Sequence, residues 1–188
     1  MANKIVVAVI GIAVIAAAYL FFFSPQAEFS SGLGEFNALL DRDGLDAGTF
    51  VPVEKPALEE FETDLQGFAA KYRGQNSDSA KALLLIADER LAMARMAKEL
   101  LNAEAEIARI YTGALDCTEA GPAAKAENAL ENSLSEIQFA LASREALISD
   151  YPEFAAAAGM ESSEDIEDFV SVISDLVSGT KSNLRAVC

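Results

Sequence analysis

Hydrophobic and polar positions divide the chain into one continuous apolar stretch and a longer region of helical periodicity. Residues 5–23 read IVVAVIGIAVIAAAYLFFF and contain no charged side chain. At ~1.5 Å rise per residue, a helix of this length spans roughly 29 Å, close to the ~30 Å hydrocarbon core of a bilayer. The pattern therefore predicts a transmembrane signal-anchor helix over residues 5–23, after a short cytoplasmic N-terminus at residues 1–4.

A cleaved secretory signal peptide is the competing interpretation of this stretch. Lys4 would end its basic region, and the three alanines at 16–18 would form the cleavage site. The apolar run continues through residues 19–23, which favours a retained anchor. Lys4 precedes the stretch and the next basic residue is Arg42, so the charges predict an inside N-terminus. We expect a single-pass inner-membrane protein whose C-terminal domain is periplasmic or extracellular.

Small residues within the apolar stretch form a candidate packing surface. Ala13 and Ala17 lie four residues apart, with Gly11 close by, and such spacing lets membrane helices approach one another. Gly11, Ala13 and Ala17 are therefore candidate residues for packing against another transmembrane helix. An alanine-rich helix without such a contact is the alternative.

Residues 24–56 lack a long periodic pattern. Glycine and proline residues interrupt them repeatedly, and such residues break long elements. The segment is predicted to be an irregular connector with one short helix at about residues 35–40, and its apolar content indicates that it lies against the following domain.

Helical periodicity begins after Pro56 and defines a helical domain at residues 57–188. Apolar residues recur every three or four positions in segments that predict helices over 57–72, 79–112, 122–149, a short turn at 154–158, and about 162 to the C-terminus. The 79–112 segment carries two adjacent apolar seams, so we expect it to contact more than one helix. The expected fold class is all-α: a single N-terminal transmembrane helix followed by an extracytoplasmic four-helix up-down bundle.

The apolar positions of the last segment are interpreted as one core-facing stripe. They are Ile166, Phe169, Val170, Ile173, Leu176, Val177, Leu184 and Val187.

The chain contains two cysteines, Cys117 and Cys188. Helices joined by short loops alternate in direction, so the ends of the long helix and of the last helix fall at the same end of the bundle. An oxidising compartment would permit a disulfide there. Closing a loop of about 70 residues would stabilise the fold by roughly 4 kcal/mol in the chain-entropy model. We expect one disulfide between Cys117 and Cys188, with two unrelated thiols as the alternative.

Composition excludes several functional classes. The net charge of −16 disfavours nucleic acid and anionic lipid headgroups as partners. The sequence contains no histidine, which excludes His-dependent triads, Glu-x-x-His di-iron sites and His-ligated zinc. It also lacks a Walker glycine loop and a G-x-S-x-G elbow. We therefore expect neither an enzyme nor a resident cofactor or metal.

Two acidic features need interpretation. Glu161, Glu164, Asp165, Glu167 and Asp168 form the densest acidic cluster, either a weak divalent-cation patch or, as we expect, a solvated helix start.

Glu89 is in phase with an apolar seam that includes Ile86 and Met93. It is a buried carboxylate with a perturbed proton, a carboxylate paired with an arginine from another helix, or, as we expect, a residue at the edge of the stripe.

The functional expectation is a non-enzymatic, membrane-tethered interaction or assembly subunit of an envelope or membrane protein complex. Its partners would be other membrane or envelope proteins, held through the transmembrane helix and the long helix. The alternative is a sensory or small-ligand-binding bundle, which requires an apolar cavity with a few convergent polar groups.

Overall fold

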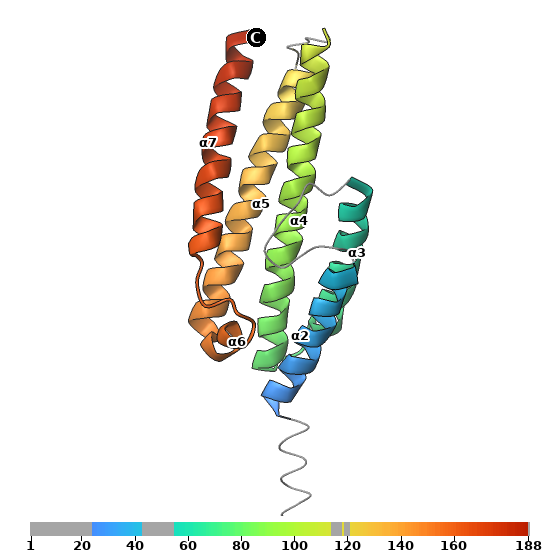
Figure 1. The fold of residues 1–188 in the computed structure, drawn as a ribbon, viewed down its shortest axis with the longest axis vertical. Helices are drawn as coiled ribbons and strands as arrows, with labels where there is room; N and C mark the ends of the chain where they lie inside the picture. Colours follow the sequence, from blue (N-terminus) through green and yellow to red (C-terminus); the bar gives the residue numbers. More distant parts are fainter. Residues whose placement is uncertain (1–23, 43–54, 114–117, 119–120, 188) are drawn as a thin grey trace, which may run out of the picture.

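The computed structural model describes residues 24–42, 55–113, 118 and 121–187. Within them the chain forms six helices and no strand: α2 (Pro25–Arg42), α3 (Lys55–Tyr72), α4 (Asp78–Tyr111), α5 (Pro122–Asp150), α6 (Pro152–Ala157) and α7 (Glu164–Val187). The long helices alternate in direction along one axis, and α4 and α7 point the same way (Figure 1). The prediction of an all-helical chain is confirmed for these residues.

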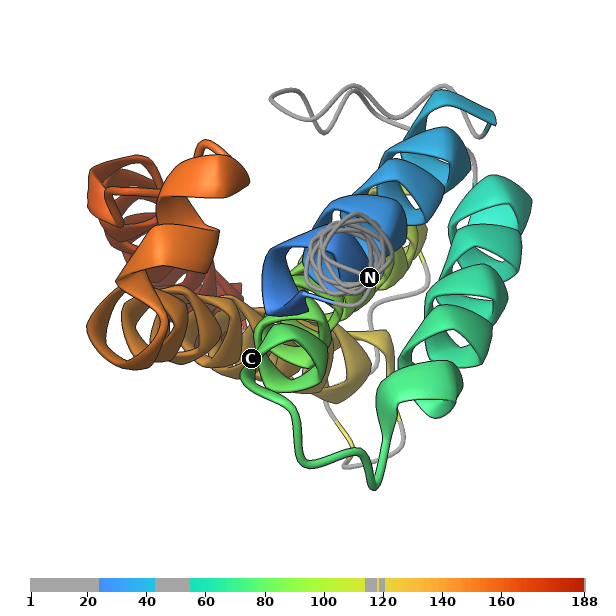
Figure 2. The same ribbon diagram turned by 90° about the horizontal axis from the view of Figure 1, so that it is seen from below.

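Helix α4 is the element on which the others pack. Ser77 caps it by accepting a hydrogen bond from the Ala80 backbone N–H at 3.3 Å. It then runs for 34 residues, about 51 Å, before Gly113 takes a φ of +95° just beyond its end. Helices α2 and α3 have 18 residues each, so neither can cover the whole of α4. Seen along the axis, α3 lies on one side of α4 and α5–α7 lie on the other (Figure 2).

The two halves of α4 have different neighbours. Around its first half, Ala87, Leu91 and Ala94 are buried in a hydrophobic cluster with side chains of α2, α3, α6 and the end of α5. Ala105 and Ala108 continue the same seam in the second half and are exposed. Around the second half, the buried cluster is formed by α4, α5 and α7. The prediction that α4 contacts more than one helix is confirmed, but its second seam is covered only in the first half.

Helix α3 is attached to α4 by a cluster of polar contacts. Arg95 Nε and Lys98 Nζ both donate to the Glu62 carboxylate, at 2.9 and 2.5 Å. Burial alone would raise the pKa of Glu62, but the hydrogen bonds from Lys98 and Arg95 outweigh it and lower the pKa below its usual value. Lys55 Nζ, at the start of α3, donates to Asn102 Oδ1 at 2.9 Å. Helix α4 continues past Asn102 to Tyr111, beyond the start of α3.

Helix α2 occupies much of the segment predicted to be an irregular connector. Ser24 caps it by accepting a hydrogen bond from the Ala27 N–H at 3.1 Å, and Phe29 and Phe36 are buried on its inner face. A Cβ atom added at Gly32 would lie 2.7 Å from the Tyr72 hydroxyl oxygen and would also collide with the Leu83 side chain. Gly32, which was expected to interrupt a helix, therefore permits close approach of α2 to α3 and α4.

The predicted membrane architecture is corrected by the structure. Within the described ranges, no helix combines the length and the apolar composition needed to cross a bilayer. The described helices are amphipathic, with charged residues on one face and apolar residues on the other. The prediction of a single-pass inner-membrane protein with an exported domain is therefore wrong. The stretch on which it depended, residues 5–23 with Gly11, Ala13 and Ala17, lies outside the described residues.

The prediction of a bundle closed by a disulfide is also corrected. The part of the chain that the structure describes contains no disulfide, and Cys117 and Cys188 both lie outside it. Helices α4 and α7 do end at the same end of the molecule (Figure 1). Parallel helices place their ends near one another, but this alone does not bring two sulfur atoms to bonding distance.

Gly32 and Gly34 provide a matched test of the packing of α2. Gly32→Ala is expected to destabilise the protein by about 1–3 kcal/mol, because the new methyl group must displace buried neighbours. Gly34 has open space around it, so Gly34→Ala should stabilise by about 0.5–1 kcal/mol through helix propensity. Urea denaturation of both variants measures the difference. Equal effects at the two positions would contradict close packing at Gly32.

The Glu62 cluster predicts a pH-dependent contribution to stability. Because its pKa is lower in the folded than in the unfolded chain, ionised Glu62 stabilises the fold above about pH 4.5. This contribution is lost as the pH falls through the folded-state pKa. Glu62→Gln should lower the free energy of unfolding at pH 7 by about 1–2 kcal/mol, and the difference from wild type should shrink as the pH falls below about 4.5. Exposed Glu60→Gln is the control, and a Glu62→Gln difference that persists in acid would disprove the assignment.

Candidate functional site

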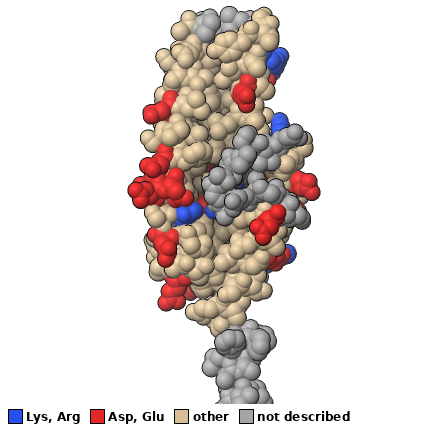
Figure 3. Space-filling view, in the orientation of Figure 1, with Lys and Arg blue, Asp and Glu red and all other residues tan. Residues whose placement is uncertain are grey.

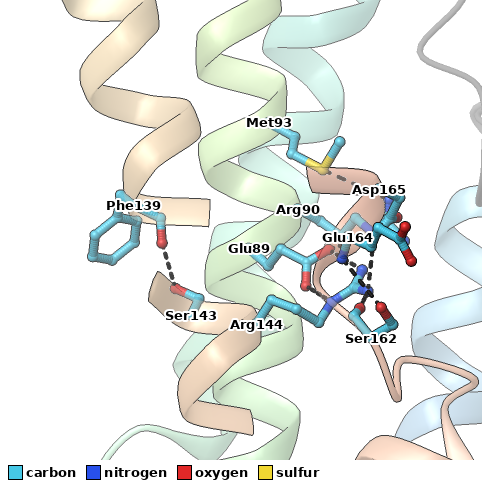
Figure 4. A network of polar contacts seen from close by, with 9 residues as sticks. All are labelled: Glu89, Arg90, Met93, Phe139, Ser143, Arg144, Ser162, Glu164 and Asp165. Atoms are coloured by element: carbon cyan, nitrogen blue, oxygen red, sulfur yellow. Dashed lines mark hydrogen bonds and ion pairs between the residues drawn. The ribbon is translucent and has the colours of Figure 1, made fainter. Parts of the chain in front are cut away.

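A bidentate ion pair is buried between α4 and α5. Glu89 is fully buried, and Arg144 is 5% exposed. Arg144 Nε donates to Glu89 Oε2 at 2.7 Å, and Nη2 donates to Oε1 at 2.9 Å (Figure 4). The expectation that Glu89 lies at the edge of its stripe is wrong; the alternative, pairing with an arginine from another helix, is what the structure shows.

Arg144 was missed in the sequence, although a signal was present. It lies seven residues after Ile137 and three before Leu147, both of which are buried on α5. An arginine in phase with a helical core stripe needs a buried partner, because an unpaired charge there is costly. Glu89 occupies the equivalent position on α4. Opposite charges in phase with the cores of two neighbouring helices would have predicted the pair.

Arg144 also holds the segment that leads into α7. Its Nη1 donates to the Ser162 carbonyl at 2.8 Å, and the same nitrogen lies 3.6 Å from Asp165 Oδ1 (Figure 4). The Asp165 side chain is 71% exposed, so solvent weakens that ion pair. The carbonyl contact is the stronger connection, since its donor is a buried charged group. One guanidinium therefore joins α4, α5 and the start of α7.

A second arginine lies beside the pair. Arg90 Nε is 3.7 Å from Glu89 Oε1, and Arg90 Nη1 lies 3.8 Å from Met93 Sδ. The buried Arg90 Nε makes no hydrogen bond within the described residues. Burial lowers the pKa of Arg90, against the attraction of Glu89. For Arg144, burial also acts to lower the pKa, but the hydrogen bonds and charge of Glu89 outweigh it and raise it. Two cations thus share one buried carboxylate.

A polar hollow of about 480 Å³ opens above this network. Its lining consists of Arg144, Gly159, Glu161, Ser162, Glu164, Asp165 and Asp168. Among the described residues, no group of three or more carboxylate, histidine or cysteine side chains could hold a metal ion. The acidic side chains instead lie in the segment before α7 and in its first two turns, and the helix dipole favours negative charge near a helix start. The hollow is charged, unlike the apolar cavity that the small-ligand alternative requires.

The outer side of α7 carries exposed apolar side chains. Val172 is 60% and Leu176 is 48% exposed; Phe169 beside them is half-buried and packs against the cluster shared with α4 and α5. The inner side buries Ile166 and Ile173 in the cluster shared with α4 and α5. The interpretation of all apolar α7 positions as one core-facing stripe is therefore wrong for Leu176. We call Phe169, Val172 and Leu176 the α7 row.

No predicted site residue lies within this arrangement. Gly11, Ala13, Ala17, Cys117 and Cys188 are all outside the described residues. Comparison of the chain with protein-family models, curated proteins and solved structures gives no match. Its function is therefore inferred from its own structure.

The sharing of Glu89 by two arginines predicts unequal effects of its mutation. Glu89→Gln leaves two buried cations without an anion and should cost about 3–5 kcal/mol of unfolding free energy. Arg144→Met leaves Glu89 with Arg90 and should cost less, on the order of 2 kcal/mol. Urea denaturation at pH 7 measures both losses.

The exposed Glu106–Arg109 pair, joined at 2.8 Å on α4, is the control for that comparison. Glu106→Gln should change stability by less than about 0.5 kcal/mol. An Arg144→Met loss equal to or larger than the Glu89→Gln loss would show that Arg90 does not share the carboxylate.

Proposed function

We propose that this chain is a non-enzymatic interaction module that binds another protein through the α7 row. The observation that carries the proposal is the exposure of Val172 and Leu176, one helical turn apart on the same side of α7. Soluble surfaces tolerate single apolar residues, but a contiguous row is typical of a binding surface. Phe169, which is half-buried against the cluster shared with α4 and α5, extends this row toward the start of the helix with its exposed part.

The position of α7 supports this proposal. Its backbone runs beside α5, whereas α4 is packed against α5, α3 and α2. Helix α7 therefore stands at the edge of the helix array, with its outer side free of other described helices (Figure 1). The exposed second half of the α4 seam, at Ala105 and Ala108, is a further region that no described helix covers.

The charge distribution also supports it. The chain has 30 acidic and 14 basic residues, yet the upper part of the face in Figure 3 carries few charged side chains. Charged residues are depleted at the centres of protein interfaces. Acidic side chains gather instead near the middle of the molecule, at the edge formed by α7 (Figure 3).

Substitution within the row tests the proposed function. In a native extract, the wild-type chain is expected to migrate with a mass well above its own 20.0 kDa on size exclusion. Leu176→Glu should release it as a monomer, because a charge at the centre of an apolar contact is costly to desolvate. The assembly is followed by immunodetection of the chain across the column.

Phe139 supplies the matched control for this experiment. It is 54% exposed on α5 and does not belong to the α7 row. Phe139→Glu should leave the assembly intact. A wild-type chain that migrates only as a monomer, or equal release by the two variants, would contradict the proposed function.

A further inference from the structure

We infer that the partner presents a basic amphipathic helix to the α7 row. This inference rests on the proposed function and specifies the partner's chemistry. It is drawn from the spacing of the row, from the glycine that continues it and from the charges along its outer edge.

The spacing of the row indicates a helical occupant. Phe169, Val172 and Leu176 are separated by three and four residues, so they form one ridge along the helix axis. Such ridges pack into the grooves of another helix, whose own apolar residues recur with the same period. A partner helix can thus contact Val172, Leu176 and the exposed part of Phe169 at once.

Gly179 lies three residues beyond Leu176, in line with the row. A glycine within a helix lowers helix stability by roughly 1 kcal/mol relative to alanine. At Gly32 this loss is offset by the close packing that the glycine permits. Gly179 has no such internal reason, because nothing lies within 4 Å of the position where its Cβ would stand. Gly34 and Gly67 are equally open, so openness alone marks no site. The placement of Gly179 at the end of the row leaves a flat surface on which a partner backbone can lie closely.

The outer edge of the row is acidic. Asp168 and Asp175 are exposed and fall on the side of the row away from the α7 core stripe, and exposed Asp165 lies one turn before Phe169. The basic Lys181 of α7 is directed elsewhere, because its ammonium group donates to Glu131 and lies 3.4 Å from Glu127 on α5. A partner helix along the row therefore meets carboxylates at its edge.

Charge complementarity selects a basic partner over a second copy of this chain. With a net charge of −16, two copies repel each other, and opposed acidic edges would add to this repulsion. Lysine or arginine residues flanking the apolar positions of a partner helix would pair with Asp168 and Asp175. The apolar row would supply affinity, and the acidic edge would supply orientation and selectivity.

Two synthetic peptides test the inference on the full chain. Both are helical 20-residue peptides with the same leucine positions, and their polar positions carry lysine in one and glutamate in the other. Fluorescence anisotropy at low salt should show binding of the lysine peptide at least about 10-fold tighter than that of the glutamate peptide. Val172→Ser/Leu176→Gln should weaken binding of the lysine peptide by at least about 10-fold, while Phe139→Gln should not change it.

The acidic edge is tested separately with Asp168→Asn/Asp175→Asn. This variant should weaken binding of the lysine peptide by roughly 3–10-fold at low salt, and the difference should disappear at about 0.5 M salt because exposed charges are screened. Circular dichroism confirms that the variants fold, which is expected because all four substituted side chains are exposed.

Each outcome decides between the two proposals. Equal binding of the two peptides, or no effect of Asp168→Asn/Asp175→Asn, would overturn the basic partner and leave the proposed function standing. A dimer of the pure chain in sedimentation that is lost in Leu176→Gln would identify a second copy as the occupant and overturn the inference. Failure of both peptides to bind would overturn it as well. The native-extract experiment decides the proposed function independently.

Discussion

The buried pair of Glu89 and Arg144 is the interaction on which the arrangement of the helices depends. Transfer of two charges out of water is costly, and such a pair is tolerated only when its geometry is good and its remaining donors are satisfied. Here both carboxylate oxygens receive a hydrogen bond from the guanidinium, and a third bond goes to the Ser162 carbonyl. The register of α4 and α5 seen here satisfies these groups, and a shifted register would separate the guanidinium from the carboxylate.

The pair also lies where the two halves of the molecule meet. Below it, α2, α3, α6 and the first half of α4 form one hydrophobic cluster with the end of α5; above it, α4, α5 and α7 form another. Since Arg144 also holds the Ser162 carbonyl, the register of α4 and α5 determines where α7 begins. The direction in which α7 then presents Val172 and Leu176 follows from that starting point. The buried polar network and the exposed apolar row are thus connected through one short segment.

Local sequence patterns predicted the helices well where a single apolar stripe dominates. The segments expected at 57–72, 79–112 and 122–149 correspond to α3, α4 and α5 within about two residues. The prediction was wrong for α2, because Gly32 and Gly34 were interpreted as breaks. A glycine that admits a neighbouring helix cannot be distinguished from one that ends a helix until the neighbour is known. The membrane architecture depended on the apolar stretch at residues 5–23 alone, and within the described ranges no helix has the length and apolar composition to cross a bilayer.

The candidate site could be predicted only in part. Glu89 was recognised as a charge within a core stripe, but its partner is 55 residues away on another helix, beyond the reach of local periodicity. Leu176 was assigned to the core because helical phase alone does not show which side of α7 another helix covers. Exposure depends on how many neighbours a helix has, and here α7 stands at an edge.

Hydrogen exchange of Arg144→Met, followed by mass spectrometry, tests the central claim most directly. If the buried guanidinium fixes the start of α7, backbone amides in residues 159–168 should exchange faster in the variant than in the wild type, while those of α2 and α3 change little. Unchanged exchange in residues 159–168, or an equal increase throughout the molecule, would show that Arg144 does not position α7.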